Sequence, residues 1–304
     1  MAEPKDRKLA VAIARCENVA AAVIDKSHKC HVVVNYQDDT PDRHIPEGWF
    51  GNLPGARVLF VSSNPSIDPA ESHESENFPR SHWTDDAIAE WVTRRIDQSW
   101  DEVPVTFQRA GHKDFLWRCV DGKYRGFGSA NSPQQTWNKT HKRAIEILGP
   151  DADPSQNYAL TEVVHCKSTN EHGVADAVPV CASKWLTSIV ETAEQARVIL
   201  ICGSKALNLW ARSAFDLSPE YGRRRKSTDE HLGIAKRDLF VSERLGRRTV
   251  VGYMGQPARS WTLSNIYGEK VVNLLGRIAW NEIPVPATTA ELHSLIGAEF
   301  QSSD

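Results

Sequence analysis

The stretch Arg57-Val-Leu-Phe-Val-Ser-Ser-Asn-Pro-Ser-Ile-Asp68 decides the architecture of this chain. Its first part, 58–61, is an apolar run of β-formers, typical of a strand buried on both faces of a parallel sheet. Pro65 cannot continue a central strand, and the small polar residues around it favour a turn. We therefore expect a short polar loop with Asn64 at its tip, at the edge where open α/β sheets bind ligands. An ordinary exit from strand to loop is the alternative.

Further apolar runs repeat this arrangement along the chain. Strands are expected at 158–164, 198–202, 238–242 and 249–254, and polar loops at 165–168, 203–205 and 255–260. Helical patterns separate the buried strands. This alternation predicts an α/β fold, a three-layer α/β/α sandwich with a central, mostly parallel four-stranded sheet. Parallel strands would bring the polar loops to one edge of that sheet.

The bulk properties are those of a globular protein of 304 residues, of which 40% are apolar and 25% charged. We expect a single domain over 1–304, with a core at about 45–275, an N-terminal helical extension at 1–44 and C-terminal helices at 276–304. No apolar run approaches the ~20 residues that span a membrane, and no secretory leader is evident. A monomeric cytoplasmic protein that binds no membrane is the expectation.

The charge is unevenly distributed, although the net charge is only −3. The segment 203–261 holds twelve Lys or Arg and six Asp or Glu, a local net charge of +6, so the remainder carries −9. A basic third of this kind can bind a phosphate backbone. A solvated loop around the run 223–226 is the alternative.

The motifs in this order resemble the uracil-DNA glycosylase superfamily over roughly residues 45–275. The resemblance is carried by the Ser-Ser-Asn-Pro-Ser loop at 62–66, Phe78, Leu160-Thr-Glu-Val-Val-His-Cys166 with Cys181 and Trp185, the Gly-Ser-Lys-Ala turn at 203–206, and Gln256-Pro-Ala-Arg-Ser260. It is nearest to the bacterial iron–sulfur branch. Ser62 and Ser66 replace the usual glycines, Glu162 stands where many members have Asn, and Gln256 stands where many have His. The chain would therefore be a divergent member.

The resemblance implies a hydrolase that cleaves the N-glycosidic bond of uracil, or of other deaminated or oxidised bases, in single- or double-stranded DNA during base-excision repair. It implies that Asn64 holds the attacking water and that Gln256 donates a hydrogen bond to the leaving base. Base-binding residues would be Ser63, Phe78, Glu162 and His165; DNA-binding residues would be Pro65, Ser66, Gly203, Ser204, Lys205, Pro257 and Arg259. The base must first be flipped out of the stack.

Each of these residues also has a structural alternative. Asn64 can be a turn residue that bonds its own backbone, Phe78 a core residue, and Gln256 or Arg259 a solvated loop residue. Glu162 can turn away from the base and orient His165 or Lys167. If it does read the base, an ionised carboxylate only accepts hydrogen bonds, whereas a protonated one could serve both groups of the base and is favoured in a desolvated pocket. Either case predicts looser base discrimination than Asn would give.

Two rival functions remain open at this point. A non-catalytic binder of damaged or abasic DNA is kept in view by the absence of His at position 256. A small-molecule enzyme with a phosphate-binding turn would rest on fold analogy alone.

The cysteines leave a cofactor question open. Cys166 and Cys181 fall near the ligand spacing of the iron–sulfur branch, which would make Cys16, Cys30, Cys166 and Cys181 the ligands of a 4Fe–4S cluster. That branch carries a close Cys-x-x-Cys pair near its N-terminus, whereas Cys16 and Cys30 stand fourteen residues apart. The spacing therefore favours reduced, packed thiols and no metal or cofactor.

Overall fold

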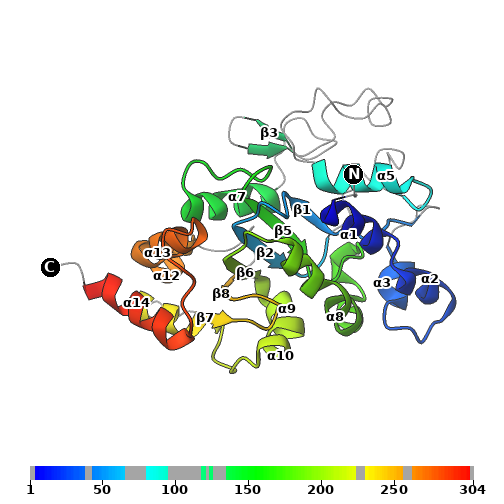
Figure 1. Ribbon diagram of the computed structural model, residues 1–304. Helices are drawn as coiled ribbons and strands as arrows, with labels where there is room; N and C mark the ends of the chain where they lie inside the picture. Colours follow the sequence, from blue (N-terminus) through cyan, green and yellow to red (C-terminus); the bar gives the residue numbers. More distant parts are fainter. Residues whose placement is uncertain are drawn as a thin grey trace.

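A six-stranded mixed sheet runs through the described part of the chain, in the order β1-β5-β2-β6-β8-β7. The computed structural model describes residues 4–37, 43–65, 80–94, 118–120, 123–125, 135–223, 230–255 and 262–301 (Figure 1). The strands are β1 (Trp49–Gly51), β2 (Val58–Ser62), β5 (Tyr158–Glu162), β6 (Val198–Cys202), β7 (Leu239–Ser242) and β8 (Thr249–Met254). A separate two-stranded pair joins β3 (Arg118–Val120) to β4 (Lys123–Arg125).

The four central strands are parallel, as the sequence predicts. β2 lies between β5 and β6, with Phe60 opposite Leu160 on one side and Leu200 on the other. β8 continues the parallel order beside β6. The carboxyl ends of all four strands therefore lie at one edge of the sheet.

The prediction of a four-stranded sheet is wrong, because an antiparallel strand adds to each side. β1 pairs antiparallel with β5, and β7 pairs antiparallel with β8. β1 has only three residues, too few to show the alternation of side chains that identifies a strand in a sequence. The Pro and Gly content of the surrounding segment predicts a loop instead. Gly51 adopts φ +105°, and a Cβ atom there would lie 2.5 Å from the carbonyl oxygen of Tyr158, so glycine permits this pairing.

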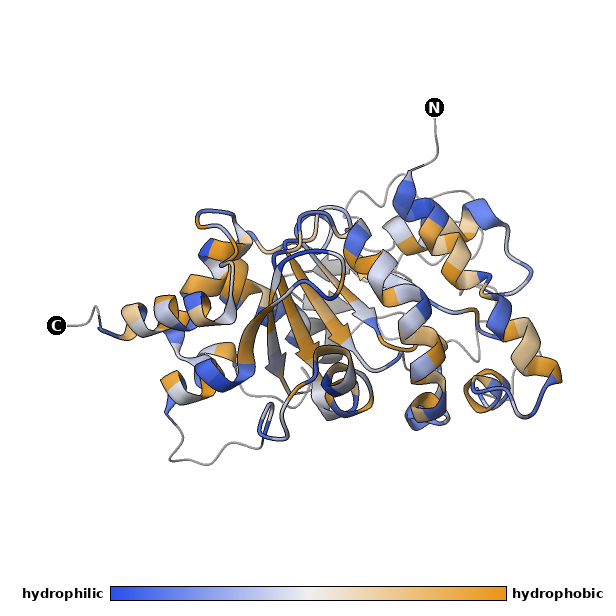
Figure 2. Cartoon of the chain, turned by 60° about the horizontal axis from the view of Figure 1, so that its bottom comes forward, coloured by the Kyte–Doolittle hydropathy of each residue, from blue (hydrophilic) through white to orange (hydrophobic). Residues whose placement is uncertain are grey.

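Successive residues of each central strand face two different apolar clusters, because side chains alternate along a strand. Leu59 and Val61 face one cluster, and Val58 and Phe60 face the other. All four are fully buried. Figure 2 shows these strands as a continuous apolar block between helices.

Helices cover both faces of the sheet (Figure 1). The first cluster is closed by α1 (Lys5–Ala14), α3 (His31–Asn35) and α8 (Val174–Thr192), and by the continuous helical stretch formed by α9 (Gly203–Ala206), the π-helix η4 (Leu207–Ala211) and α10 (Arg212–Phe215). The second is closed by α7 (Gln135–Leu148), α11 (His231–Asp238), α12 (Leu263–Tyr267), α13 (Glu269–Ala279) and α14 (Thr289–Gln301). None of the helices in the described ranges combines the length and hydropathy needed to cross a bilayer.

The N-terminal extension is broken into short helices that pack on the rest of the chain. The pattern at 8–25 predicts one helix, but the structure has α1 and then α2 (Glu17–Ile24), with Cys16 between them. Arg7 of α1 donates to Glu90 of α5 (Asp85–Arg94) at 2.6 Å. The Thr84 hydroxyl oxygen caps α5 by accepting a hydrogen bond from the backbone N–H of Ala87.

Candidate functional site

Three of the predicted loops meet at the carboxyl edge of the parallel strands. The loop after β2 and the segment after β5 run side by side, since Val164 N–H donates to Ser63 O at 2.9 Å and Ser168 N–H to Pro65 O at 3.2 Å. The turn after β6 begins at Gly203, whose φ of +87° favours glycine. The sequence argument for convergence is therefore confirmed for these three loops.

The Asn64 amide is fixed at one end and unpaired at the other. Its Nδ2 donates to Ser168 Oγ and to Pro65 O, each at 2.9 Å. Its Oδ1 is buried, and no residue in the described ranges hydrogen-bonds to it. The bond to Pro65 is the turn role that the sequence left open, whereas a buried acceptor without a partner calls for a water or a ligand. Asn64 therefore presents an oriented acceptor at the sheet edge.

Glu171 links two of these loops, and the sequence reasoning missed it. Its carboxylate accepts a hydrogen bond from Ser63 Oγ through one oxygen and pairs with Lys205 Nζ through the other. Glu171 belongs to η3 (Thr169–Glu171), a short irregular turn with no hydrophobic period and no motif. Asn170 and Glu171 both have positive φ, +53° and +58°. Such backbone costs about 1–3 kcal/mol for a non-glycine residue, and it clusters at functional sites.

Glu162 ends β5 beside Ser62 of β2 and is 6% exposed. It is thus a buried carboxyl group in the strand next to the Asn64 loop. Lys167, which could be oriented by Glu162, pairs with Glu47 at 2.6 Å, and the alternative role of Glu162 stays open.

His165 lies against a different pocket from the one expected for a base-binding residue. Its ring is fully buried, and Nδ1 is 2.8 Å from the carbonyl oxygen of Glu47. Burial lowers the pKa of His165 to about 4, against a smaller raising effect of that bond. The imidazole is neutral at pH 7 and lines the pocket formed by the cysteines.

Cys16, Cys30, Cys166 and Cys181 line one pocket, together with Pro46, His165 and Trp185. Two come from the N-terminal helices, one follows β5 and one lies on α8. The Cys181 sulfur accepts a hydrogen bond from His165 N–H at 3.4 Å. Burial, with a smaller contribution from Cys16, raises the pKa of the Cys30 thiol to about 11. Burial also raises the pKa of Cys181 to about 12, against a lowering effect of the hydrogen bond from His165 N–H.

The arrangement of the four cysteines that line this pocket determines whether they can bind a metal ion or a cluster. No group of three or more His, Cys, Asp or Glu in the described ranges is arranged to hold one metal ion. The ligands of a 4Fe–4S cluster bind four different irons and therefore stand further apart than the ligands of one ion. The convergence of four thiols and a backbone N–H bond to one sulfur fit such a cluster.

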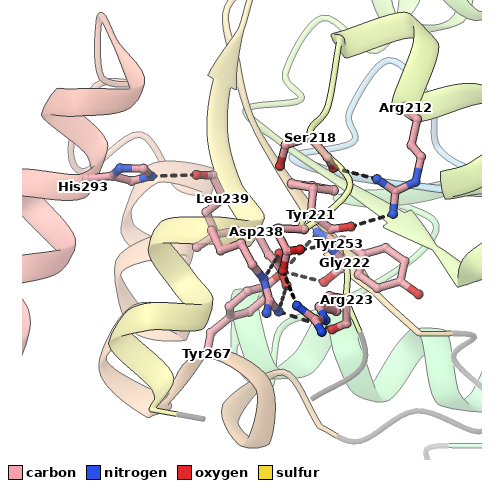
Figure 3. Close-up of polar contacts among 12 residues, drawn as sticks. Arg212, Ser218, Tyr221, Gly222, Arg223, Asp238, Leu239, Tyr253, Tyr267 and His293 are labelled. Carbon is pink, nitrogen blue, oxygen red and sulfur yellow. Dashed lines mark hydrogen bonds and ion pairs between the residues drawn. The ribbon is translucent and has the colours of Figure 1, made fainter. Parts of the chain in front are cut away.

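Much of the charge in the basic third holds the structure together. Arg212 donates to the carbonyl oxygens of Ser218 and Tyr221, and the buried Asp238 accepts from Gly222 N–H at 2.9 Å (Figure 3). Paired arginines elsewhere in the segment are Arg223, Arg237, Arg244, Arg247 and Arg248. The basic third also contains α11 (His231–Asp238), so it is not one continuous loop. The local charge of +6 thus overstates what faces a ligand.

Five predicted site residues lie outside the described residues, and their roles stay predictions. They are Ser66, Phe78, Gln256, Pro257 and Arg259. No family model and no curated protein sequence matches this chain, so the motifs and the geometry above carry the functional assignment.

Proposed function

We propose that this protein is a DNA glycosylase that hydrolyses the N-glycosidic bond of uracil, with the three-layer α/β/α architecture of the uracil-DNA glycosylase superfamily. The observation that carries the proposal is the Asn64 amide. Its nitrogen is bonded to Ser168 and Pro65 while its buried oxygen has no partner in the described ranges. That arrangement suits a water held in line for attack on the sugar.

The chemistry asks for positioning more than for a strong base. The sugar gains positive charge as the bond breaks, so a water placed at attack distance can add without prior proton removal. In the proposed mechanism Asn64 Oδ1 accepts a hydrogen bond from that water, and Glu162 faces the extruded base. Gln256 and Phe78 keep the roles that the family resemblance implies.

The phosphate next to the flipped nucleotide would bind at the turn after β6. Backbone N–H groups at the start of the 203–215 helical stretch favour an anion. Lys205 adds a positive charge there, with a side chain that is 49% exposed. In this proposal the loop after β2 holds the water, the end of β5 faces the base, and the turn after β6 binds the phosphate.

We also propose that the four cysteines hold a 4Fe–4S cluster, which reverses the preference drawn from their spacing. The spacing argument concerned the sequence separation of Cys16 and Cys30, and the fold brings both to the pocket of Cys166 and Cys181. A bound cluster would deprotonate the thiols and cross-link the N-terminal helices to the sheet. Its role would be structural, because the pocket takes no part in the steps above.

The deciding experiment measures base release by the wild-type protein and by Asn64→Ala. Alkali cleaves an oligonucleotide wherever a base has been lost, so strand scission reports release from a uracil-bearing duplex. We expect scission with wild type and a loss of about 100-fold or more in Asn64→Ala, with DNA binding nearly unchanged, because only the water is misplaced. Asn273→Ala, at an exposed position of α13, is the matched control and should retain full activity.

The outcomes separate the functions. Binding without base release by wild type would favour the non-catalytic binder. Full activity in Asn64→Ala would remove Asn64 from the mechanism.

A further inference from the structure

Glu171 joins the loop that carries Asn64 to the turn that carries Lys205. One carboxylate oxygen accepts from Ser63 Oγ and the other pairs with Lys205 Nζ. The residue reaches this position from a third segment, after β5. A single side chain therefore contacts two of the three loops that converge at the sheet edge.

The two contacts of the Glu171 carboxylate differ: the hydrogen bond with Ser63 is firm, and the ion pair with Lys205 is exchangeable. Ser63 is buried, whereas the Lys205 side chain is 49% exposed. An ion pair that is half exposed to water is weakly held. A phosphate oxygen that approaches Lys205 can replace the carboxylate, because both are anionic oxygen acceptors. The bond from Ser63 to the other oxygen need not break in that exchange.

The backbone at Glu171 points to a function. Asn170 and Glu171 have consecutive positive φ values, and a glutamate has no intrinsic preference for that conformation. Strain of this kind persists where the surrounding structure imposes it. Here the strained turn brings the carboxylate to Ser63 and Lys205.

We propose that Glu171 is a positioning residue that occupies Lys205 in the free protein and gives it up to a DNA phosphate on binding. Throughout, its bond to Ser63 keeps the Asn64 loop in place. The inference rests on the proposed function and adds to it a competition between an internal carboxylate and the phosphate. Glu171 touches neither the water nor the base in this scheme.

The test pairs Glu171→Gln with Glu171→Ala. Glutamine removes the charge but keeps an acceptor for Ser63, whereas alanine removes both. Affinity is measured on an undamaged duplex, which involves no chemistry, and the maximal single-turnover rate on a uracil-bearing duplex. Glu191→Gln removes an equal charge from the exposed far end of α8 and serves as control. Thermal midpoints show whether each variant is folded.

We expect both Glu171 variants to bind the duplex about two- to fivefold more tightly, since the competing ion pair is worth little in water. The maximal rate should stay within about twofold in Glu171→Gln and fall about tenfold or more in Glu171→Ala, where the Asn64 loop loses its anchor. The gain in affinity should vanish when Lys205→Ala is added. Glu191→Gln should match wild type.

Several results would overturn the inference. Unchanged or weaker binding in Glu171→Gln, or a gain that persists without Lys205, would show that no competition with phosphate exists. Equal maximal rates in the two Glu171 variants would remove the link through Ser63. Wild-type protein that binds DNA but releases no base would end the glycosylase proposal and leave the affinity test intact. Protein that binds no DNA would end both.

Discussion

In the proposed glycosylase, Glu162 would set the breadth of the substrate range. Uracil presents an N–H donor beside a carbonyl acceptor at the edge that a side chain reads. An asparagine amide matches both groups, whereas a carboxylate offers acceptors only. Glu162 is 6% exposed at the end of β5, so little water can reach it to bridge the carboxylate to the carbonyl acceptor of the base. Discrimination between bases should be loose for this reason.

The corresponding prediction concerns Glu162→Asn. Wild type should release oxidised or deaminated bases besides uracil, and the variant should narrow this range toward uracil. Rates on matched duplexes with uracil, hydroxymethyluracil, xanthine or hypoxanthine measure the range. A profile identical in the two proteins would show that this carboxylate does not read the base.

His141 gives a pH dependence of stability that is separate from the site. Its ring is buried on α7, with Nδ1 2.9 Å from the Tyr158 hydroxyl. Burial lowers its pKa below the ordinary 6.5, against a smaller raising effect of Asp153. As pH falls below about 6.5, the unfolded chain therefore binds a proton more readily than the folded protein. The free energy of unfolding should decrease in that range and be unaffected by His141 above it.

His141→Gln should remove part of this loss. Thermal midpoints between about pH 5 and 8 would fall less on acidification than those of wild type. Asn273→Ala, at an exposed position of α13, is the control and should leave the wild-type slope. A variant whose midpoint tracks wild type at every pH would show that His141 does not contribute.

For single residues, the sequence identified those that follow a recognisable apolar run. Asn64 follows an apolar run and Lys205 follows another, so their convergence could be predicted. Glu171 could not be, because its position depends on two positive φ values in a turn without a period. His165 stands in the predicted segment, but its burial beside the cysteines depends on the N-terminal helices.

Among the elements, the N-terminal helices determine whether the four cysteines come together. α1 and α2 flank Cys16, and α3 begins after Cys30. The N-terminal extension therefore supplies two of the four cysteines that line the pocket. Through a cluster, these helices would be fixed to the end of β5 and to α8. The same thiols without a cluster would leave the extension held by apolar packing and ion pairs.

A metal measurement distinguishes these states. Protein purified without oxygen should be brown, with broad visible absorbance and about four irons per chain. Cys30→Ser should lose iron and lower the thermal midpoint, while Cys202→Ser, at a buried thiol outside the pocket, should retain iron. Colourless wild-type protein that takes up no iron during reconstitution would restore the interpretation of packed thiols.

The buried elements were predictable, and the edge elements were not. β6 has the predicted bounds because its residues are apolar on both faces. β1 is too short to show alternation, and α11 lies in a segment whose charges obscure its few apolar positions. Tertiary contacts rather than local pattern establish these elements.

At the scale of the whole molecule, the position of charge matters more than its sum. Arg247 donates to the carbonyl oxygens of Ala193 and Glu194, near the start of β6 and so away from the carboxyl edge of the sheet. Arg212 holds the chain at Ser218 and Tyr221. The arginine count alone therefore exaggerates the charge available to a bound anion, and among the described residues Lys205 is the cation that the loop geometry favours for the proposed phosphate contact.

The strand order also determines when each strand can find its neighbours if the chain folds while it is being synthesised. β2 is made early, yet its neighbours in the sheet are β5 and β6, so Val58 pairs with Tyr158 and Val198. Loops this long close slowly, and strands without partners are prone to aggregation. The nascent apolar run 58–61 must wait until its partners at 158–162 and 198–201 have been synthesised. A chaperone that shields this run during translation would therefore protect the yield of native protein.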